Sequence, residues 1–385
     1  MADPRPEELG DPSRILPKSI LDTDLYKFTM QQAVLQHFPD AQCSYQFTHR
    51  DKHVFFTRRS INQFRDAVSR FSEITLTDEE LTWLPRACPY FKPAYLSYLR
   101  AYRFKPSQVH IRFVPRWQYE SDSASLPPSP MPEEPNGDPN EQGRVEIEAV
   151  GPWVEAILWE VPLMATLSEI YFRTVDTDWT HDGQEDIAYA KAKAMLSAGC
   201  VFSEFGTRRR RSFHVQDVVV ATLLRAEREL RAPGKISGTS NVYLAMKYGI
   251  PAVGTIAHEW FMGIAAMRGY EHANSIAMDL WEATYKNVLL LVLTDTFSTQ
   301  AFWHVRPPRP SSQSQSDISE EPQTPIDGVL DPVQKKVRNL NKKLKAIDEL
   351  KEKSQRGERL EATQLKKIES EVEIRKELTS LSVSS

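Results

Sequence analysis

Hydrophobic positions in the first part of the chain recur at both helix and strand spacings. An apolar stripe of helical spacing runs from Leu25 to Phe38, where Pro39 ends it, and Asp22 and Thr23 are candidate caps. Alternating or helically spaced apolar residues then predict strands over 42–48 and 107–119 and helices over 60–72 and 93–103. This part of the chain therefore predicts a mixed α+β unit.

Short apolar strands and helices alternate over the second part of the chain. The fold resumes at Val145 and continues through an apolar helix over about 153–172. The elements predicted after it are a helix at 186–198, a strand at 200–204, a helix at 213–230, a loop at 237–241 opening a further helix, a strand at 252–256, a helix at 273–285 and a buried strand at 288–294. This alternation is typical of parallel sheets, so we predict an α/β unit.

Three stretches differ from the rest in composition. Residues 121–143 and 306–330 are rich in Pro, Ser and acidic residues, which indicates a flexible insertion and a linker. Residues 331–381 are highly charged and carry apolar stripes on both sides of Gly357, which predicts a helical hairpin. The predicted organisation is a disordered tail at 1–14, an N-terminal domain at 15–145 that includes the insertion, an α/β domain at 146–305, the linker and the hairpin.

Charge and cysteine content narrow the function classes. Residues 331–385 hold 14 Lys and Arg against 10 Asp and Glu, whereas the remainder is acidic, which suggests two pieces of different origin. Neither balance is extreme enough to indicate nucleic-acid binding. The three cysteines lie far apart, which argues against disulfides and a cysteine zinc site. No apolar run is long enough to span a membrane and no signal peptide is recognisable, so we expect a cytoplasmic or nuclear protein.

The loops that follow the predicted strands form the candidate site, because ligands gather at the carboxyl ends of strands in α/β folds. Residues 204–211, Glu-Phe-Gly-Thr-Arg-Arg-Arg-Arg, offer arginines that form bidentate pairs with carboxylates or phosphates. Residues 237–241, Ser-Gly-Thr-Ser-Asn, place small hydroxyl residues at a helix start, where backbone amides bind phosphate. His258 beside Glu259 is a candidate acid, base or nucleophile.

Each loop also has a simpler interpretation. The arginine run is equally a solvated basic surface, and a run such as Ser-Gly-Thr-Ser-Asn is more often only a helix N-cap. A lone histidine is more often structural than catalytic, and Glu259 is a candidate cap for the next helix. Met262 stands where a metalloprotease would carry its second histidine, so zinc chemistry is disfavoured and we assign no metal ligand.

Short motifs occur in or beside these loops and near the N-terminus. They are Thr-Asp-Leu-Tyr-Lys at 23–27, Glu-Phe-Gly-Thr-Arg-Arg at 204–209, Gly-Thr-Ser-Asn at 238–241, Gly-Thr-Ile-Ala-His-Glu-Trp at 254–260 and Leu-Thr-Asp-Thr-Phe at 293–297. In order and context they resemble the nicotinate phosphoribosyltransferase family in its fungal form, over about residues 15–308. The resemblance implies a small α+β domain packed on an incomplete α/β barrel of the type II phosphoribosyltransferase kind, usually in a homodimer with shared sites.

The resemblance also implies an activity and roles for individual residues. The family's enzymes act in NAD biosynthesis as ATP-dependent ligases, joining nicotinate to phosphoribosyl pyrophosphate to give nicotinate mononucleotide and pyrophosphate. The implied roles are Tyr26, from the partner subunit, and Phe205 around the pyridine ring; Arg208 on the nicotinate carboxylate; Gly238, Thr239 and Ser240 along the substrate and phosphate pocket; His258 as the residue that ATP phosphorylates, with Glu259 as a candidate to orient it; and Asp295 near the ribose or its substrate-bound Mg²⁺.

The sequence also departs from the family pattern. A Gly-[Leu/Val]-Arg-x-Asp-Ser-Gly-Asp-Pro loop, which binds phosphate in the family, does not follow Phe297, and the match fades at 306–308. Its absence predicts weak turnover or none. Residues 331–381 instead resemble the C-terminal helical tail of eukaryotic translation initiation factor 2A. The alternative hypothesis is therefore an inactive remnant or a chimeric gene product whose basic tail contacts the ribosome or a translation factor.

Overall fold

The computed structural model describes residues 15–51, 53–117, 137–286 and 288–303, together with Ile347 and Glu371. The chain divides into two compact units, Met1–Arg309 and Pro310–Ser385. The predicted tail at 1–14, most of the insertion at 121–143, the linker at 306–330 and nearly all of the hairpin at 331–381 lie outside the described residues. The elements below belong to the first unit.

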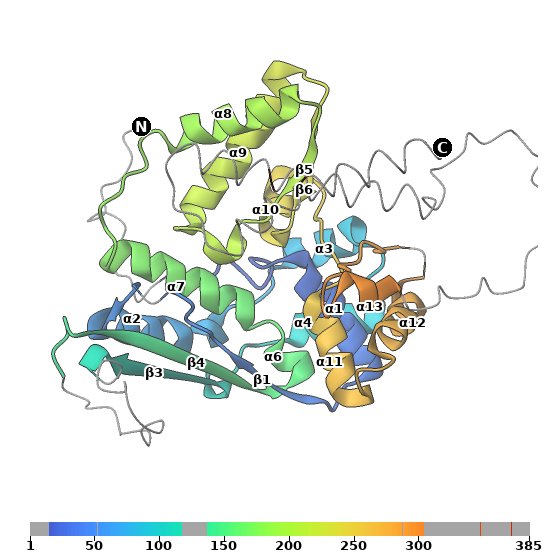
Figure 1. Ribbon diagram of the computed structural model, residues 1–385, viewed down its shortest axis with the longest axis horizontal. Helices are drawn as coiled ribbons and strands as arrows, with labels where there is room; N and C mark the ends of the chain where they lie inside the picture. Colours follow the sequence, from blue (N-terminus) through green and yellow to red (C-terminus); the bar gives the residue numbers. More distant parts are fainter. Residues whose placement is uncertain are drawn as a thin grey trace, which may run out of the picture. The chain divides into compact units, whose positions relative to one another are not determined.

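An antiparallel sheet forms one part of this unit, with β4 (Gln142–Pro152) at its centre. It pairs with β1 (Gln42–Gln46) and β2 (Phe56–Thr57) along one edge and with β3 (Val109–Pro115) along the other. Alternate β4 residues point into the core because side chains of a strand alternate between its faces. Helices α2 (Arg58–Ser69) and α7 (Glu160–Thr174) lie over the sheet (Figure 1). Strands β1 and β3 confirm two predictions, whereas the sequence analysis missed β4.

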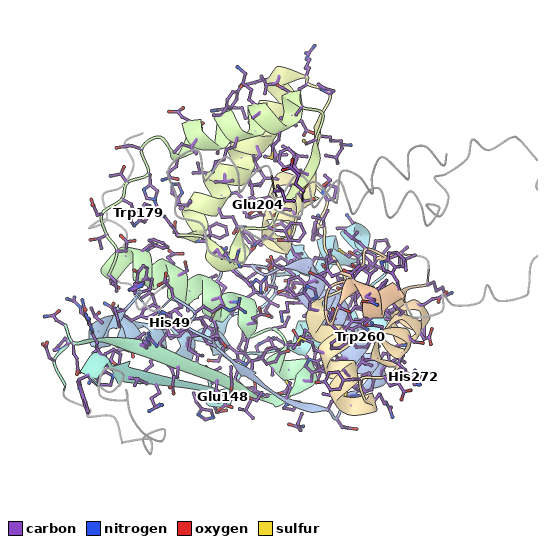
Figure 2. The ribbon with its side chains drawn as sticks, viewed as in Figure 1. His49, Glu148, Trp179, Glu204, Trp260 and His272 are labelled. Carbon is purple, nitrogen blue, oxygen red and sulfur yellow. The ribbon has the colours of Figure 1, made fainter. Side chains whose placement is uncertain are left out.

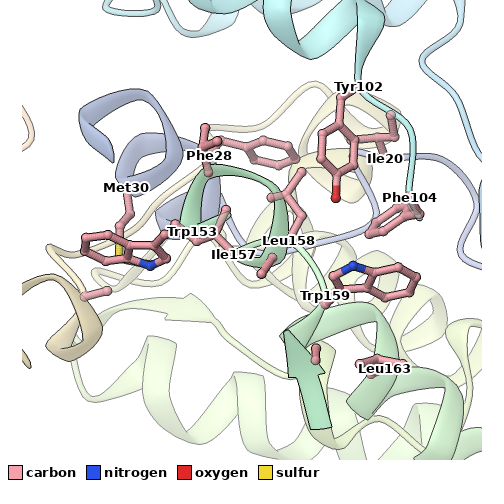
Figure 3. Close-up of a cluster of buried hydrophobic side chains, with 14 of the residues drawn as sticks. Ile20, Phe28, Met30, Tyr102, Phe104, Trp153, Ile157, Leu158, Trp159 and Leu163 are labelled. Carbon is pink, nitrogen blue, oxygen red and sulfur yellow. The ribbon is translucent and has the colours of Figure 1, made fainter. Parts of the chain in front are cut away.

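A helical layer adjoins the sheet and contains the main hydrophobic core. Helix α1 (Leu25–His37) is buried on nearly all sides over its first ten residues. It packs against α6 (Trp153–Ala156) and α12 (Ala273–Tyr285), and α11 (His258–Arg268) packs against α12. Large side chains, among them Phe28, Met30, Trp153 and Trp159, fill the space between these elements (Figure 3). Helices α3 (Asp78–Ala87), α4 (Pro93–Ala101) and α13 (Thr299–Trp303) also contribute side chains to this core or pack against it.

The N-terminus of α1 differs from the sequence prediction. Asp24, not Asp22 or Thr23, is the N-cap residue, and its side chain makes no capping hydrogen bond. The Asp22 side chain is instead fully buried and paired with Arg210. The predicted capping by Asp22 and Thr23 is therefore wrong, because a buried arginine from a distant segment binds the Asp22 carboxylate.

Parallel pairing characterises the segment between residues 201 and 292. Strands β5 (Val201–Glu204) and β6 (Lys235–Thr239) pair in parallel, and parallel bridges continue the run from Thr239 to Ala252 and from Ile256 to Val292. Helices α8 (Gln184–Ser197), α9 (Phe213–Leu230) and α10 (Val242–Tyr248) alternate with these strands and enclose a second hydrophobic cluster. Short parallel strands separated by helices confirm the predicted α/β class. The domain boundary at 145/146 stays a prediction, and β4 runs continuously across that position.

Three predictions for this segment need correction. Ser237, Gly238 and Thr239 form the end of β6, not a loop. Residues 252–256 and 288–294 contribute single bridges, not strands. The apolar run predicted to be buried exposes Val288 to 46%, Leu290 to 51% and Leu291 to 65%. Among the described residues, pairing of this run is seen only through the Ile256–Val292 bridge and the bond from the Ile256 amide to the Leu291 carbonyl. Leu289 and Val292 pack partly against the main core, so the run is only partly enclosed. No helix of the described part is both long and apolar enough to cross a membrane.

Gly238 occupies a position that only glycine fits. Its φ is 150°, and a Cβ there would lie 2.1 Å from the Pro251 carbonyl oxygen. We expect Gly238→Ala to lower the free energy of unfolding by more than about 2 kcal/mol, measured by urea denaturation. Gly249→Ala is the control, because its φ of 63° is also positive but its Cβ would meet nothing within 4 Å. Equal losses in the two variants would contradict the steric argument.

Candidate active site

The four consecutive arginines after β5 lie in four different environments. The Arg208 side chain is 46% exposed, and its Nη1 donates to Glu160 Oε1 at 2.6 Å. Arg209 is exposed to solvent. Arg210 is buried, and the Arg211 guanidinium lies 5.1 Å from the ring centres of both Phe172 and Trp179. Arg208 is therefore the arginine of this run that is both anchored to a neighbouring carboxylate and open to solvent.

A buried lysine connects Arg208 to the segment that carries the candidate histidine. Lys27 is fully buried, and its ammonium lies 2.5 Å from Glu160 Oε2 and 2.6 Å from Glu259 Oε2. Burial alone would lower the pKa of Lys27, but the two carboxylates outweigh it and the pKa is raised. Burial likewise opposes ionisation of Glu160, yet Lys27 and Arg208 hold the pKa of its carboxyl below the ordinary value. Lys27, Glu160 and Arg208 are therefore charged at neutral pH.

One aromatic ring adjoins the Arg208 guanidinium, and a second lies on the same loop. The Arg208 guanidinium lies 6.0 Å from the ring centre of Tyr26, and Phe205, on the same loop, is 54% exposed. Burial raises the pKa of the Tyr26 hydroxyl, so it stays protonated. The partner-subunit origin of Tyr26 that the resemblance implied stays a prediction. The contact described here joins Tyr26 and Arg208 of one chain. An arginine beside an aromatic ring suits a planar anion.

The predicted phosphate loop uses its side chains for internal bonds. Thr239 Oγ1 donates to Glu204 Oε2 at 2.7 Å, and Ser240 Oγ donates to Asp24 Oδ1 at 2.7 Å. Both hydroxyls are buried, Thr239 as the last residue of β6 and Ser240 directly after it. Glu204 is the last residue of β5 (Figure 2). Asn241 accepts the Leu244 amide at 3.0 Å and caps α10, which confirms the simpler interpretation of this run. A role for these residues in the phosphate pocket stays a prediction.

His258 is the first residue of α11 and is oriented by a residue that the sequence analysis missed. Its Nδ1 lies 2.9 Å from Thr296 Oγ1, and its Nε2 lies 3.5 Å from Asp295 Oδ1. The imidazole is 43% exposed and Asp295 is 71% exposed. Glu259 points elsewhere: it binds Lys27 and accepts hydrogen bonds from the Tyr45 hydroxyl and, at 2.8 Å, from Trp153 Nε1. Thr296 and Asp295 therefore lie at the His258 ring, whereas Glu259 does not.

The first turn of α1 brings these segments together. The Leu25 amide donates to the Ser240 carbonyl at 2.8 Å, and a Cβ on Gly254 would lie 3.3 Å from the Tyr26 nitrogen. Lys27 then reaches Glu259, the neighbour of His258. A continuous series of contacts thus runs from the loop after β5, through α1, to α11, whereas a shared face for the three candidate loops stays a prediction. Among the described residues no group of three or more His, Cys, Asp or Glu side chains is placed to hold a metal ion.

This arrangement can serve two kinds of chemistry. Arg208 presents a guanidinium with one of its five N–H donors used by Glu160, and the others suit a carboxylate. His258 presents a solvent-accessible imidazole whose two nitrogens are distinguished by their neighbours, which is what a general acid–base or a phosphate acceptor requires.

Family models match both parts of this unit. The nicotinate phosphoribosyltransferase N-terminal domain matches residues 21–126 and the nicotinate phosphoribosyltransferase family matches residues 200–308. A crystal structure titled as a putative nicotinate phosphoribosyltransferase from Saccharomyces cerevisiae superimposes with a TM-score of 0.67 at 37% identity, covering 76% of this chain and 68% of that one. This chain belongs to the nicotinate phosphoribosyltransferase family. The resemblance drawn from its motifs is confirmed, together with the predicted fold class.

Other members of the family show how much of the fold the chain contains. A probable nicotinate phosphoribosyltransferase from Schizosaccharomyces pombe is 42% identical over 286 residues, which are 74% of this chain and 64% of that protein. The nicotinate phosphoribosyltransferase of Methanosarcina acetivorans is 38% identical over 302 residues, 74% of this chain and 66% of that protein. The chain thus spans just under two thirds of these relatives. A third family model, the C-terminal domain of eukaryotic translation initiation factor 2A, matches residues 335–381 and confirms the second resemblance.

Proposed function

We propose that this chain binds nicotinate through Arg208 and takes part in forming nicotinate mononucleotide from nicotinate and phosphoribosyl pyrophosphate in NAD biosynthesis. The observation that carries the proposal is the half-exposed Arg208 guanidinium, anchored to Glu160 and flanked by Tyr26. A pyridine carboxylate matches both features, because its carboxylate fits the guanidinium and its ring fits an aromatic face. Membership of the family supports the choice of nicotinate over other planar anions.

Coupling to ATP belongs to the same proposal. His258 would accept the phosphoryl group from ATP, and Thr296 and Asp295 would hold its ring. The Mg²⁺ that accompanies nucleotide and pyrophosphate substrates is bound mainly through phosphate oxygens and one or two carboxylates. The exposed Asp295 carboxylate fits such a role. On this basis we propose an ATP-dependent, ligase-type enzyme. We also propose a homodimer, as in the family that the chain resembles, located in the cytoplasm or the nucleus.

The proposal is tested by nicotinate binding and product formation with the purified full chain. We expect calorimetry to detect nicotinate binding, and chromatography to detect slow formation of nicotinate mononucleotide or none, because the family's Asp-Ser-Gly-Asp-Pro loop is absent from the sequence. Absence of nicotinate binding would overturn the proposed function. Robust turnover would instead show that the missing loop is dispensable.

His258→Ala is expected to remove phosphorylation by ATP. The wild-type chain incubated with γ-labelled ATP should acquire an acid-labile label, and the variant should lose at least about nine-tenths of it, because the acceptor nitrogen is gone. His272→Ala is the control, since His272 is 73% exposed in the same unit and lies beside Glu271 much as His258 lies beside Asp295. Equal labelling of both variants would exclude His258 as the acceptor.

A second candidate function concerns residues 335–381. Their match to a translation initiation factor domain favours a contact between this segment and the ribosome or a translation factor. The segment is net basic, which suits a ribosomal partner. Co-sedimentation of the full chain with ribosomes, compared with a chain ending at residue 309, tests this candidate. Equal sedimentation of the two chains would exclude it.

A further inference from the structure

Lys27 has no role in the chemistry described so far, yet it is fully buried at the centre of the candidate site. A buried ammonium is costly unless it is paired, and here it lies within 2.6 Å of two carboxylates from different helices. Glu160 begins α7 and Glu259 lies in the first turn of α11, while Lys27 lies in the first turn of α1. One ammonium therefore joins the N-terminal ends of three helices.

Glu160 transmits the effect of this ammonium to Arg208. One carboxylate oxygen accepts from Lys27 and the other accepts from Arg208 at 2.6 Å. Lys27 and Arg208 thus share the negative charge of the Glu160 carboxylate, which would otherwise pair with Arg208 alone. Without Lys27, Glu160 and Glu259 would leave an uncompensated negative charge beside the guanidinium, which would repel an anionic ligand and hold Arg208 more tightly to Glu160.

We propose that Lys27 is a positioning residue that sets the strength of anion binding at Arg208 by neutralising Glu160 and Glu259. The inference rests on the proposed function, because it takes nicotinate as the anion. It predicts opposite effects on nicotinate affinity for the two partners of the Lys27–Glu259 ion pair. Removing the Lys27 charge should weaken nicotinate binding, whereas removing the Glu259 charge should leave the binding unchanged or make it tighter.

The experiment measures nicotinate affinity by calorimetry for the full chain and four variants: Lys27→Met, Glu259→Gln, the Lys27→Met/Glu259→Gln double variant, and Lys105→Met. The last is the matched control, because the Lys105 ammonium pairs with Glu155 at 2.6 Å but is 56% exposed and belongs to none of the site's elements. We expect Lys27→Met to bind at least about tenfold more weakly, the equivalent of about 1.4 kcal/mol. The double variant restores the charge balance and should bind within about threefold of the wild type.

The outcomes separate this inference from the proposed function. A wild-type chain that does not bind nicotinate overturns both. If the wild-type chain binds nicotinate and Lys27→Met binds it with an affinity within about threefold of the wild type, only the inference is overturned. Equal weakening by Lys27→Met and Glu259→Gln also overturns it, since this would indicate a structural role for the pair. If Lys27→Met does not fold, Glu259→Gln decides: binding at least as tight as in the wild type supports the inference, and weaker binding overturns it.

Discussion

Replacing Asp22 with Asn is expected to lower the free energy of unfolding by about 3–5 kcal/mol, the cost of breaking a buried ion pair by removing one partner. Arg210 donates to both carboxylate oxygens, Nη1 to Oδ1 at 2.7 Å and Nη2 to Oδ2 at 2.9 Å. Asn241 also donates to Oδ1, at 2.9 Å. The variant leaves the Arg210 guanidinium buried and opposite a neutral amide, so its charge is no longer compensated. Urea denaturation at pH 7 measures the loss.

The pH dependence of this loss has a defined sign. Burial alone would raise the pKa of Asp22, but Arg210 outweighs it and holds that pKa below the ordinary value. The folded chain therefore binds fewer protons at Asp22, and the ion pair stabilises it fully above the unfolded pKa of about 4. The stabilisation is lost as the pH falls through the folded pKa. The difference in free energy of unfolding between the wild type and Asp22→Asn should thus be largest near pH 7 and become smaller below about pH 4.

Asp217→Asn provides the control for this prediction. Asp217 also pairs with a cation, Lys247, but the lysine side chain is 40% exposed, so the pair contributes at most about 1 kcal/mol. A loss of unfolding free energy in Asp22→Asn as small as that in Asp217→Asn would contradict the role of the buried pair. So would a difference in unfolding free energy from the wild type that does not become smaller at acidic pH.

Local sequence signals predicted several elements closely. Helix α9 spans Phe213–Leu230, the predicted range, because its apolar positions follow a helical period and Ser212 caps it by accepting the Val215 amide at 3.1 Å. Strand β4 was missed although Val145, Ile147 and Ala149 alternate with polar residues, which is a strand signal. The apolar run at 288–294 was instead predicted as a buried strand where the structure has a single bridge. Composition does not reveal which sheet edge a strand will pair with or what will cover it.

The site was predictable only where its residues lie in recognisable motifs. Arg208, Tyr26 and His258 all belong to such motifs. Glu160 was missed because its partner Lys27 lies far away along the chain, and the Lys27–Glu259 contact likewise spans 232 residues. Thr296 was missed although it lies inside the Leu293–Phe297 motif, since nothing local shows that its hydroxyl faces His258. Long-range ion pairs follow from topology, which periodicity alone does not specify.

Arg208→Ala is expected to weaken nicotinate binding by about 2–4 kcal/mol, or roughly 30-fold to 1,000-fold in dissociation constant. The Arg208 guanidinium lies beside Tyr26 and is partly exposed to solvent, so it is the group that would bind the nicotinate carboxylate. In the variant, that carboxylate would face Glu160, which is also negatively charged. Both the lost attraction and the remaining repulsion reduce binding. Calorimetric titration of the full chain with nicotinate measures the change, and circular dichroism shows whether the variant remains folded.

Two further variants distinguish recognition by a guanidinium from a general effect of positive charge. Arg209→Ala removes an exposed neighbouring arginine and should change nicotinate affinity by less than about threefold, the scale of a screened surface charge. Arg208→Lys keeps the charge but loses the planar pair of donors, so its affinity should fall between those of the wild type and Arg208→Ala. Equal affinities for Arg208→Ala and Arg209→Ala would mean that the arginine run acts only as a basic surface. Full affinity in Arg208→Lys would mean that charge alone, without bidentate geometry, holds the carboxylate.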